Sequence, residues 1–244
     1  MKLGFVKRYA MSRKERSRGF TLIELLVVIA VIALLMGILL PALGKAKKQG
    51  QAVRCLSNLK QIGVATYLYA QDNETMVPRD ETDGHWMVLF MPYVGGQSNE
   101  VLNYYELDIY DCPNYPDKEQ TVDYCMNAWD PKKNKELRRA TKLDEFKRPG
   151  QTIYIADYAY IADAPQIQIV RKDEDRGQLH LKLRWLDVYA ANQLPSGTDQ
   201  TRRVARERHG KNTNCLFADG HAEKRNSMDM TPWDWGLPRT DQTP

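Results

Sequence analysis

A long apolar segment near the N-terminus constrains this chain more than any other feature. Residues 25–43 contain no charged side chain, and the apolar run extends back to Phe20 with Glu24 as its one charged residue. Twenty-four residues of helix would be about 36 Å long, enough to span a hydrocarbon core with some tilt. A core helix of a soluble protein rarely lacks polar residues for so long. We therefore predict a transmembrane helix over residues 20–43.

The segment before this run is strongly basic. Of the 35 Lys and Arg residues, seven lie in residues 1–19 beside one of the 31 acidic residues, which leaves 28 basic against 30 acidic residues elsewhere. The rest of the chain has no basic stripe interleaved with aromatic residues, so we expect no nucleic-acid partner. The positive-inside rule places the N-terminus in the cytoplasm and the residues after 44 outside. An ordinary secretory signal cleaved near residues 42–44 is the competing interpretation, but its apolar core would be too long and would contain Glu24.

The carboxylate of Glu24 needs an explanation, because ionisable residues inside a membrane span usually have a partner. If the chain is cut between Gly19 and Phe20, Phe20 gains a free ammonium group. The ammonium group of a neighbouring copy could then pair with Glu24, which would neutralise both charges and fix the register between subunits. We predict that Glu24 serves assembly.

The stretch "GFTLIELLVVIAVIALL" (19–35) resembles the N-terminal signal of type IV prepilins and pseudopilins. The resemblance implies that residues 1–19 are a leader, that a prepilin peptidase cleaves after Gly19, and that the amine of Phe20 is methylated. It also implies that Pro41 kinks the helix. The implied partners are further pilin-like subunits, an inner-membrane assembly platform and an assembly ATPase.

The helical pattern continues past the apolar run. Over residues 44–72 one face combines apolar and small residues at three- and four-residue spacing, with polar residues between them. The predicted buried positions are Ala52, Cys55, Leu56, Leu59, Ile62, Gly63, Thr66 and Tyr69, and the predicted polar positions include Asn58. We expect an α+β, pilin-like fold, in which this amphipathic half packs on an antiparallel sheet of an external domain over residues 73–244.

Several segments of that domain have patterns of their own. We predict a short helix over 85–95, a strand over 151–157, a hairpin from 166–171 and 178–186, and a second hairpin from 214–217 and 221–224. We expect the irregular tail from residue 227 to dock through Trp233 and Trp235.

A second resemblance concerns a large bacterial group of pseudopilin-like proteins. It rests on residues 54–78, on "HWMVLFMPYVG" (85–95), "DCPNYP" (111–116) and "YCMNAW" (124–129), and on a C-terminal H-x9-DG segment, which is residues 209–220 here. We expect His209, Asp219 and Gly220 to have structural roles at a turn in which Gly220 adopts a positive φ angle.

The four cysteines, Cys55, Cys112, Cys125 and Cys215, include no CxxC pair, so a zinc ribbon is not expected. In an external domain disulfides are possible. The sequence favours Cys112 with Cys125 or Cys55 with Cys112 and does not decide between them. Free or buried thiols are the alternative.

The sequence indicates no catalytic residues, since it has no GxSxG, HExxH or P-loop motif. His209, Asp219 and His221 could converge on a metal, but a structural role is favoured, so we predict no metal ligand. Bound calcium in the acidic loops 71–84 and 171–177 is a further possibility, although solvated loops are favoured.

These features together predict a structural subunit of a pseudopilus or a type IV pilus-like filament, with protein secretion as the expected role. It would be anchored in the cytoplasmic membrane by a single span, with its domain in the periplasm or outside the cell. One alternative is a minor pilin that binds DNA, a glycan or a surface, for which Trp233 and Trp235 are the candidates. The other is a membrane-anchored, metal-dependent enzyme that uses His209 and Asp219.

Overall fold

The structure is a computed structural model, and it describes residues 20–79, 85–96, 104–130, 132–133, 135–137, 139–160, 186–196 and 202–238. The chain forms two compact units, Met1–Lys45 and Ala46–Pro244, and one helix contributes to both. The leader, the predicted hairpin strand 166–171 and all but the last residue of its partner 178–186 lie outside the described residues.

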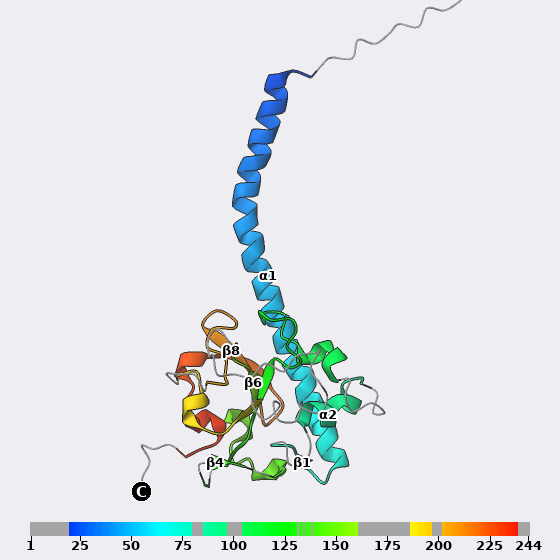
Figure 1. Cartoon of the computed structure of the whole chain (residues 1–244), viewed down its shortest axis with the longest axis vertical. Coiled ribbons are helices and arrows are strands. Elements are labelled where there is room, and N and C mark those ends of the chain that lie inside the picture. The colour runs from blue at the N-terminus through cyan, green and yellow to red at the C-terminus, as the bar shows by residue number, and fades with distance from the viewer. Residues whose placement is uncertain are drawn as a thin grey trace, which may run out of the picture. The chain divides into compact units, whose positions relative to one another are not determined.

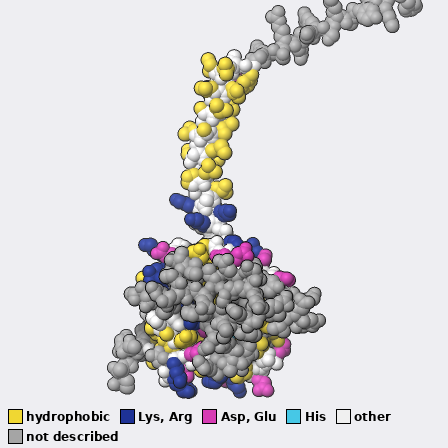
Figure 2. All heavy atoms as spheres, viewed as in Figure 1, with side chains coloured by type: hydrophobic (Ala, Val, Ile, Leu, Met, Phe, Trp, Pro, Cys, Tyr) yellow, Lys and Arg dark blue, Asp and Glu magenta, His cyan; other side chains and the backbone are white. Residues whose placement is uncertain are grey.

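The helix α1 is the dominant element of the chain and runs from Leu22 to Asp72 (Figure 1). It contains Pro41 and continues through it. The helix is long and apolar enough to cross a membrane by its length and composition. Over residues 22–43 the large apolar side chains are exposed. Figure 2 shows apolar side chains along the face of this segment that it presents, and Lys and Arg side chains where the apolar run ends. In the sequence these include Lys45, Lys47 and Lys48. A surface of this kind needs lipid or other helices to cover it.

The second unit is built on a five-stranded sheet of order β7-β2-β6-β8-β9. These strands are β2 (Tyr124–Asn127), β6 (Ile153–Asp157), β7 (Asp187–Val188), β8 (Asn212–Phe217) and β9 (Ala222–Asn226). All neighbouring pairs are antiparallel except β2 with β7, which is parallel. The α+β class with a long helix packed on a sheet is therefore confirmed, and the sheet, expected to be antiparallel, contains one parallel pair.

The second half of α1 packs on this sheet through the predicted face. Cys55, Leu59 and Ile62 are fully buried there, and Leu56 and Tyr69 are partly buried. Asn58, predicted to be a polar surface position, is buried instead. Its side-chain amide donates hydrogen bonds to the carbonyl oxygens of Asp108 and Asp111, which satisfies the polar group inside the protein.

Short elements complete the domain. The predicted helix at 85–95 is present as α2 (Trp86–Phe90) and the 3-10 turn η1 (Met91–Tyr93). Two small sheets pair β1 (Met76–Val77) with β5 (Thr141–Lys142), and β3 (Trp129–Asp130) with β4 (Lys135–Glu136). In the part of the chain that the structure describes, the other 3-10 turns are η2 (Tyr104–Glu106), η3 (Asp108–Tyr110), η4 (Leu143–Glu145), η5 (Pro149–Gln151), η7 (Ala191–Gln193), η8 (Ser227–Asp229) and η9 (Pro232–Trp235).

The C-terminal hairpin and the docking of the tail are confirmed. β8 and β9 pair in continuous register from Asn212 with Asn226 to Leu216 with Ala222. Trp235 is fully buried, and its carbonyl oxygen accepts a hydrogen bond from the Asn127 side chain of β2. The described part of the tail thus packs on the domain, with Trp235 in its core.

Candidate functional site

The start of α1 holds the residues of the predicted processing and assembly site. Thr21 is the N-cap of the helix, and Glu24 is its third residue. The Thr21 backbone N–H and its hydroxyl each donate to Oε2 of Glu24 at 2.8 Å, while the Glu24 N–H donates to the Thr21 hydroxyl at 3.2 Å. This reciprocal arrangement is a capping box, and it satisfies amide groups that a helix start leaves unpaired.

Sequence reasoning did not find this partner for Glu24, although the spacing of Thr21 and Glu24 fits the S/T-x-x-E pattern. Phe20, directly before the cap, is 69% exposed. Gly19 lies outside the described residues. Within the first unit, the described residues thus present an accessible Phe20, a capped helix start and an uncovered apolar helix.

A second constellation lies inside the Ala46–Pro244 unit. Cys55 comes from α1, Cys112 follows η3, Asp157 ends β6, and His209 precedes β8. All four residues are buried, and their ligand atoms lie within 4.8 Å of one another. Sequence reasoning had placed His209 at the β8–β9 turn with Asp219, and this was wrong. The backbone N–H of His209 bonds to the carbonyl of Asn212 at the open end of the hairpin, and its ring points into this cluster.

The distances within this cluster are short. Sγ of Cys55 lies 3.1 Å from Oδ1 of Asp157. Nε2 of His209 lies 3.2 Å from Oδ2 of Asp157 and 3.6 Å from Sγ of Cys112. The Tyr124 hydroxyl approaches Sγ of Cys55 at 3.4 Å. Two sulfur atoms, a carboxylate and an imidazole therefore share one small volume.

The neighbouring main chain and side chains hold these groups in place. The Asn214 backbone N–H donates to Oδ2 of Asp157 at 2.7 Å. The Cys112 backbone N–H donates to the Asp123 carboxylate, also at 2.7 Å. The Asn114 amide contacts Nδ1 of His209 at 3.2 Å. Neighbouring segments therefore hold Asp157, Cys112 and His209 in position.

The electrostatics follow from this packing. Burial raises the pKa of the Cys55 thiol well above its usual value. The hydrogen bond with Cys55 lowers the pKa of Cys112 to about 6, against the opposing effect of burial. Burial opposes the protonation of His209, but its hydrogen bonds with Asp157 and Cys112 raise its pKa to about 9. The protonation of Cys112 and of His209 therefore depends on the neighbouring groups of the cluster.

The β8–β9 turn is separate from this cluster. Gly220 has φ +85°, as the turn prediction required. Asp219 accepts hydrogen bonds from the backbone and the ring of His221. Asp219 thus serves the turn, as expected, and the three-residue metal site of His209, Asp219 and His221 is not brought together.

All four cysteines are free thiols. Neither predicted disulfide is present: Sγ of Cys125 points to the carbonyl of Ala156, and Cys55 and Cys112 meet as thiols in the cluster. Asp157 was not predicted as a site residue. The sequence offers one signal for Asp157: it is the last residue of the predicted strand 151–157 and the one charged residue in that strand.

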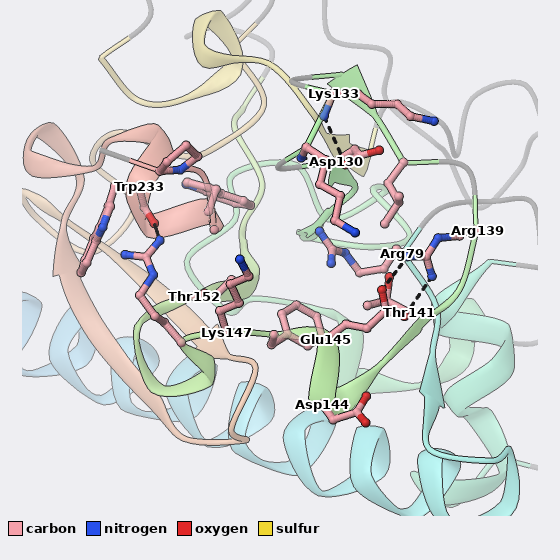
Figure 3. A pocket seen from close by; sticks show the side chains of 17 residues that line it. Arg79, Asp130, Lys133, Arg139, Thr141, Asp144, Glu145, Lys147, Thr152 and Trp233 are labelled. Atoms are coloured by element: carbon pink, nitrogen blue, oxygen red, sulfur yellow. Dashed lines mark hydrogen bonds and ion pairs between the residues drawn. The ribbon is translucent and has the colours of Figure 1, made fainter. Parts of the chain in front are cut away.

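An open pocket of about 930 Å³ lies elsewhere in the domain (Figure 3). Its arginines are engaged by the protein itself. Arg139 pairs with Glu145 at 2.6 Å, and Arg148 stacks on the Trp233 ring at 3.9 Å while donating to two tail carbonyls. Trp235 is buried and Trp233 is partly covered, so the two tryptophans do not form the exposed aromatic patch that a binding module would need.

Of the known families, the one described as "prokaryotic N-terminal methylation motif" matches residues 14–40. No curated protein and no solved structure matches the chain. The match does not reach residues 209–220, so the grouping by the H-x9-DG segment stays a prediction. The matched segment contains Phe20, the Thr21–Glu24 capping box and most of the exposed apolar helix. The chain therefore carries the prepilin-type N-terminal signal of type IV pilin-like proteins.

Proposed function

We propose that this chain is a structural subunit, a pseudopilin or pilin-like protein, that is cleaved after Gly19, methylated on Phe20 and polymerised into a filament for protein secretion. The observation that carries the proposal is the methylation motif at residues 14–40, which includes most of the exposed apolar half of α1. The motif implies processing by a prepilin peptidase and assembly between pilin-like subunits.

The geometry at the helix start supports a role for Glu24 in assembly. Both hydrogen bonds that Thr21 donates end on Oε2, so Oε1 keeps its lone pairs for another donor. The ammonium group of Phe20 on a neighbouring subunit, shifted along the filament axis, would supply that donor. The same carboxylate would then cap its own helix and bind the next one.

The apolar helix and the motif support membrane anchoring. In our proposal the basic leader stays in the cytoplasm and the domain is exported, in line with the positive-inside rule. An inner-membrane platform and an assembly ATPase would then extract the subunit from the membrane and add it to the filament. Packing among the apolar halves of α1 would form the filament core.

We propose that the domain has no enzymatic activity. Every side chain of the Cys55, Cys112, Asp157 and His209 cluster is buried, which leaves a substrate no access. A minor pilin with a binding role is the second candidate. The positions of Trp233 and Trp235 favour the structural role over that candidate, because both residues pack against the chain itself.

The test is intact-mass analysis of the chain from the membrane fraction of a host with a prepilin peptidase. We expect loss of residues 1–19 and one added methyl group, and retention of the leader in a peptidase-deficient strain. Shearing and imaging should then show filaments that contain the mature chain. A mature N-terminus near Lys45 would instead support an ordinary signal peptide, and a correctly processed chain that never enters filaments would refute the structural role.

A further inference from the structure

The cluster of Cys55, Cys112, Asp157 and His209 joins four segments that are far apart in the sequence. Cys55 and Asp157 are separated by 102 residues, and Cys112 and His209 by 97. Each donor comes from a different element: the helix, the loop after η3, the end of β6, and the loop before β8. A buried group of this composition is costly unless its charges and lone pairs are satisfied.

We infer that these four side chains form a tetrahedral Zn²⁺ site that fastens α1 to the sheet. Thiolate sulfur, imidazole nitrogen and carboxylate oxygen are the ligands that Zn²⁺ takes in proteins, and four protein ligands are typical of structural sites. The site needs no other component, and it is independent of whether the chain forms a filament.

The distances fit this geometry. Bonds of about 2.0–2.3 Å at tetrahedral angles would place neighbouring donor atoms about 3.3–3.8 Å apart. Sγ of Cys55 is 3.1 Å from Oδ1 of Asp157, and Nε2 of His209 is 3.2 Å from the other carboxylate oxygen, Oδ2, and 3.6 Å from Sγ of Cys112. The four ligand atoms all lie within 4.8 Å of one another. One ion could therefore contact all four donors after small shifts of the side chains.

The surroundings of His209 also suit a metal ligand. With Nε2 on the ion, Nδ1 carries the proton and needs an acceptor. The Asn114 amide faces Nδ1 at 3.2 Å, and its buried Oδ1 has no hydrogen-bond partner. A half turn of this amide about its terminal torsion would place Oδ1 against the Nδ1 proton, and would thus pair an oxygen that is otherwise unsatisfied.

The net charge of the proposed site is also close to zero. Two thiolates and a carboxylate contribute three negative charges, so a bound Zn²⁺ would reduce the net charge to −1. The guanidinium of Arg208, next to His209 in the chain, is attracted by Asp157 and Cys112. Arg208 lies over the Tyr115 ring at 4.1 Å, which holds it beside the cluster. The complete site with Arg208 is then close to neutral, as a buried site should be.

The position of the ligands indicates a structural role. The four donors complete a tetrahedral shell and leave no open position for a substrate or an activated water. Cys55 is the one ligand on α1, so the ion would bind the stalk helix to three segments of the domain. A disulfide between Cys55 and Cys112 is the rival arrangement. It would use both sulfur atoms and leave His209 and Asp157 without an ion.

The experiment uses the full-length chain, purified in detergent under reducing conditions and incubated with Zn²⁺ alone. After removal of free metal, we expect about one zinc per chain by inductively coupled plasma mass spectrometry. Cys55→Ala, Cys112→Ala, Asp157→Ala and His209→Ala should each lower zinc affinity more than about tenfold. The matched controls, Cys125→Ala, Cys215→Ala and His221→Ala, should keep it.

Two measurements on the unmodified chain do not depend on whether a variant folds. Replacing zinc with Co²⁺ should give the visible bands of tetrahedral cobalt and a thiolate-to-cobalt charge-transfer band. For the second measurement, the chain is purified without reductant, denatured in the presence of a chelator and then alkylated, again without reductant. This treatment should modify all four cysteines. Substoichiometric zinc, a cobalt spectrum without thiolate bands, or zinc retained in both Cys112→Ala and His209→Ala would overturn the site. Modification of only two cysteines would establish the disulfide instead.

Discussion

Gly63 of α1 lies so close to Gly220 in the β8–β9 turn that a Cβ atom on Gly63 would be 2.8 Å from the Gly220 carbonyl oxygen. The same Cβ would also be 2.8 Å from Cδ1 of Leu216. The helix backbone and the turn therefore touch directly. This contact explains why a residue that weakens helices is present in the middle of α1.

The first prediction concerns this contact. Gly63→Ala should lower the free energy of unfolding by about 1–3 kcal/mol, because the new methyl group overpacks the interface. This loss should appear although alanine favours the helix by about 1 kcal/mol. Urea unfolding of the full-length chain in detergent, followed by tryptophan fluorescence, measures it.

Gly50→Ala is the matched control for this variant. Gly50 lies in the same helix, and a Cβ there would have no atom within 4 Å. The control should therefore be neutral or stabilise the protein by up to about 1 kcal/mol. Equal effects of the two substitutions would show that α1 does not pack tightly on the turn at Gly63.

The second prediction separates backbone strain from crowding at Gly220. Gly210 and Gly220 have similar angles, φ +79° and +85°, but a Cβ on Gly220 would lie 2.9 Å from Cε2 of Tyr67, whereas one on Gly210 would meet nothing. Gly210→Ala should cost about 1–2 kcal/mol from the left-handed backbone alone. Gly220→Ala should cost clearly more in the same unfolding assay, and equal costs would exclude a contribution from Tyr67.

The third prediction concerns Asn127, which is fully buried in β2. Its amide donates to the carbonyls of Ile153 and Trp235, and its Oδ1 accepts from the Trp129 N–H and from Arg79. Asn127→Ala should lower the free energy of unfolding by at least about 2 kcal/mol, since it leaves buried groups unpaired.

The network also contains a charge, the buried guanidinium of Arg79. Burying a charge costs free energy unless the group is hydrogen-bonded. Burial lowers the pKa of Arg79 to about 10, so the guanidinium is still charged at neutral pH. It donates hydrogen bonds to the carbonyls of Asn127 and Trp129 and to the Asn127 side chain. Asn226→Ala serves as the control, because Asn226 is exposed and caps η8 with one hydrogen bond. It should cost about 0.5–2 kcal/mol. If the Asn127 variant costs no more than this, the network does not hold the tail on the sheet.

The fourth prediction tests whether Glu24 acts between subunits or only within its own helix. Thr21→Ala removes the capping box but keeps the carboxylate, whereas Glu24→Leu removes both. Both variants should insert in the membrane, and Glu24→Leu should do so at least as well as the unmodified chain, because it removes a charge. We expect Thr21→Ala to form filaments and Glu24→Leu to form none, with Glu24→Asp intermediate.

Membrane fractionation followed by filament shearing measures both steps of this prediction. Normal filaments from Glu24→Leu would show that the neighbour's amine needs no counter-charge from this residue. Equal loss of filaments in Thr21→Ala and Glu24→Leu would mean that the helix cap alone explains why the carboxylate is present.

Local features were predictable because their causes are local. The apolar run from Phe20, the end of α1 at Asp72 and the hairpin across residues 218–220 follow from hydrophobic spacing and turn chemistry within a few residues. The prepilin-type signal is likewise one contiguous stretch. The Thr21–Glu24 capping box is equally local, since both residues lie within one helical turn and fit the S/T-x-x-E pattern.

Long-range pairings decided what the sequence left open or misplaced. β7 pairs with β2 in parallel. This pairing joins segments far apart in the sequence, so no local sequence pattern predicts it. A polar side chain such as Asn58 is expected at the surface. In the structure it is buried, because the carbonyls of Asp108 and Asp111 accept hydrogen bonds from its amide. These two acceptors lie about 50 residues further along the chain and reach Asn58 only when the domain folds.

The sequence by itself determined the membrane-length helix, its processing signal and the α+β class, since hydrophobic periodicity and short motifs are sufficient for these. Only the tertiary structure decided that His209 leaves the turn and meets Cys55, Cys112 and Asp157 in one buried cluster. The reason is physical: the four donors come from segments up to 154 residues apart (209 less 55). They become neighbours only when the packing of α1 on β6 and β8 excludes water from the space between them.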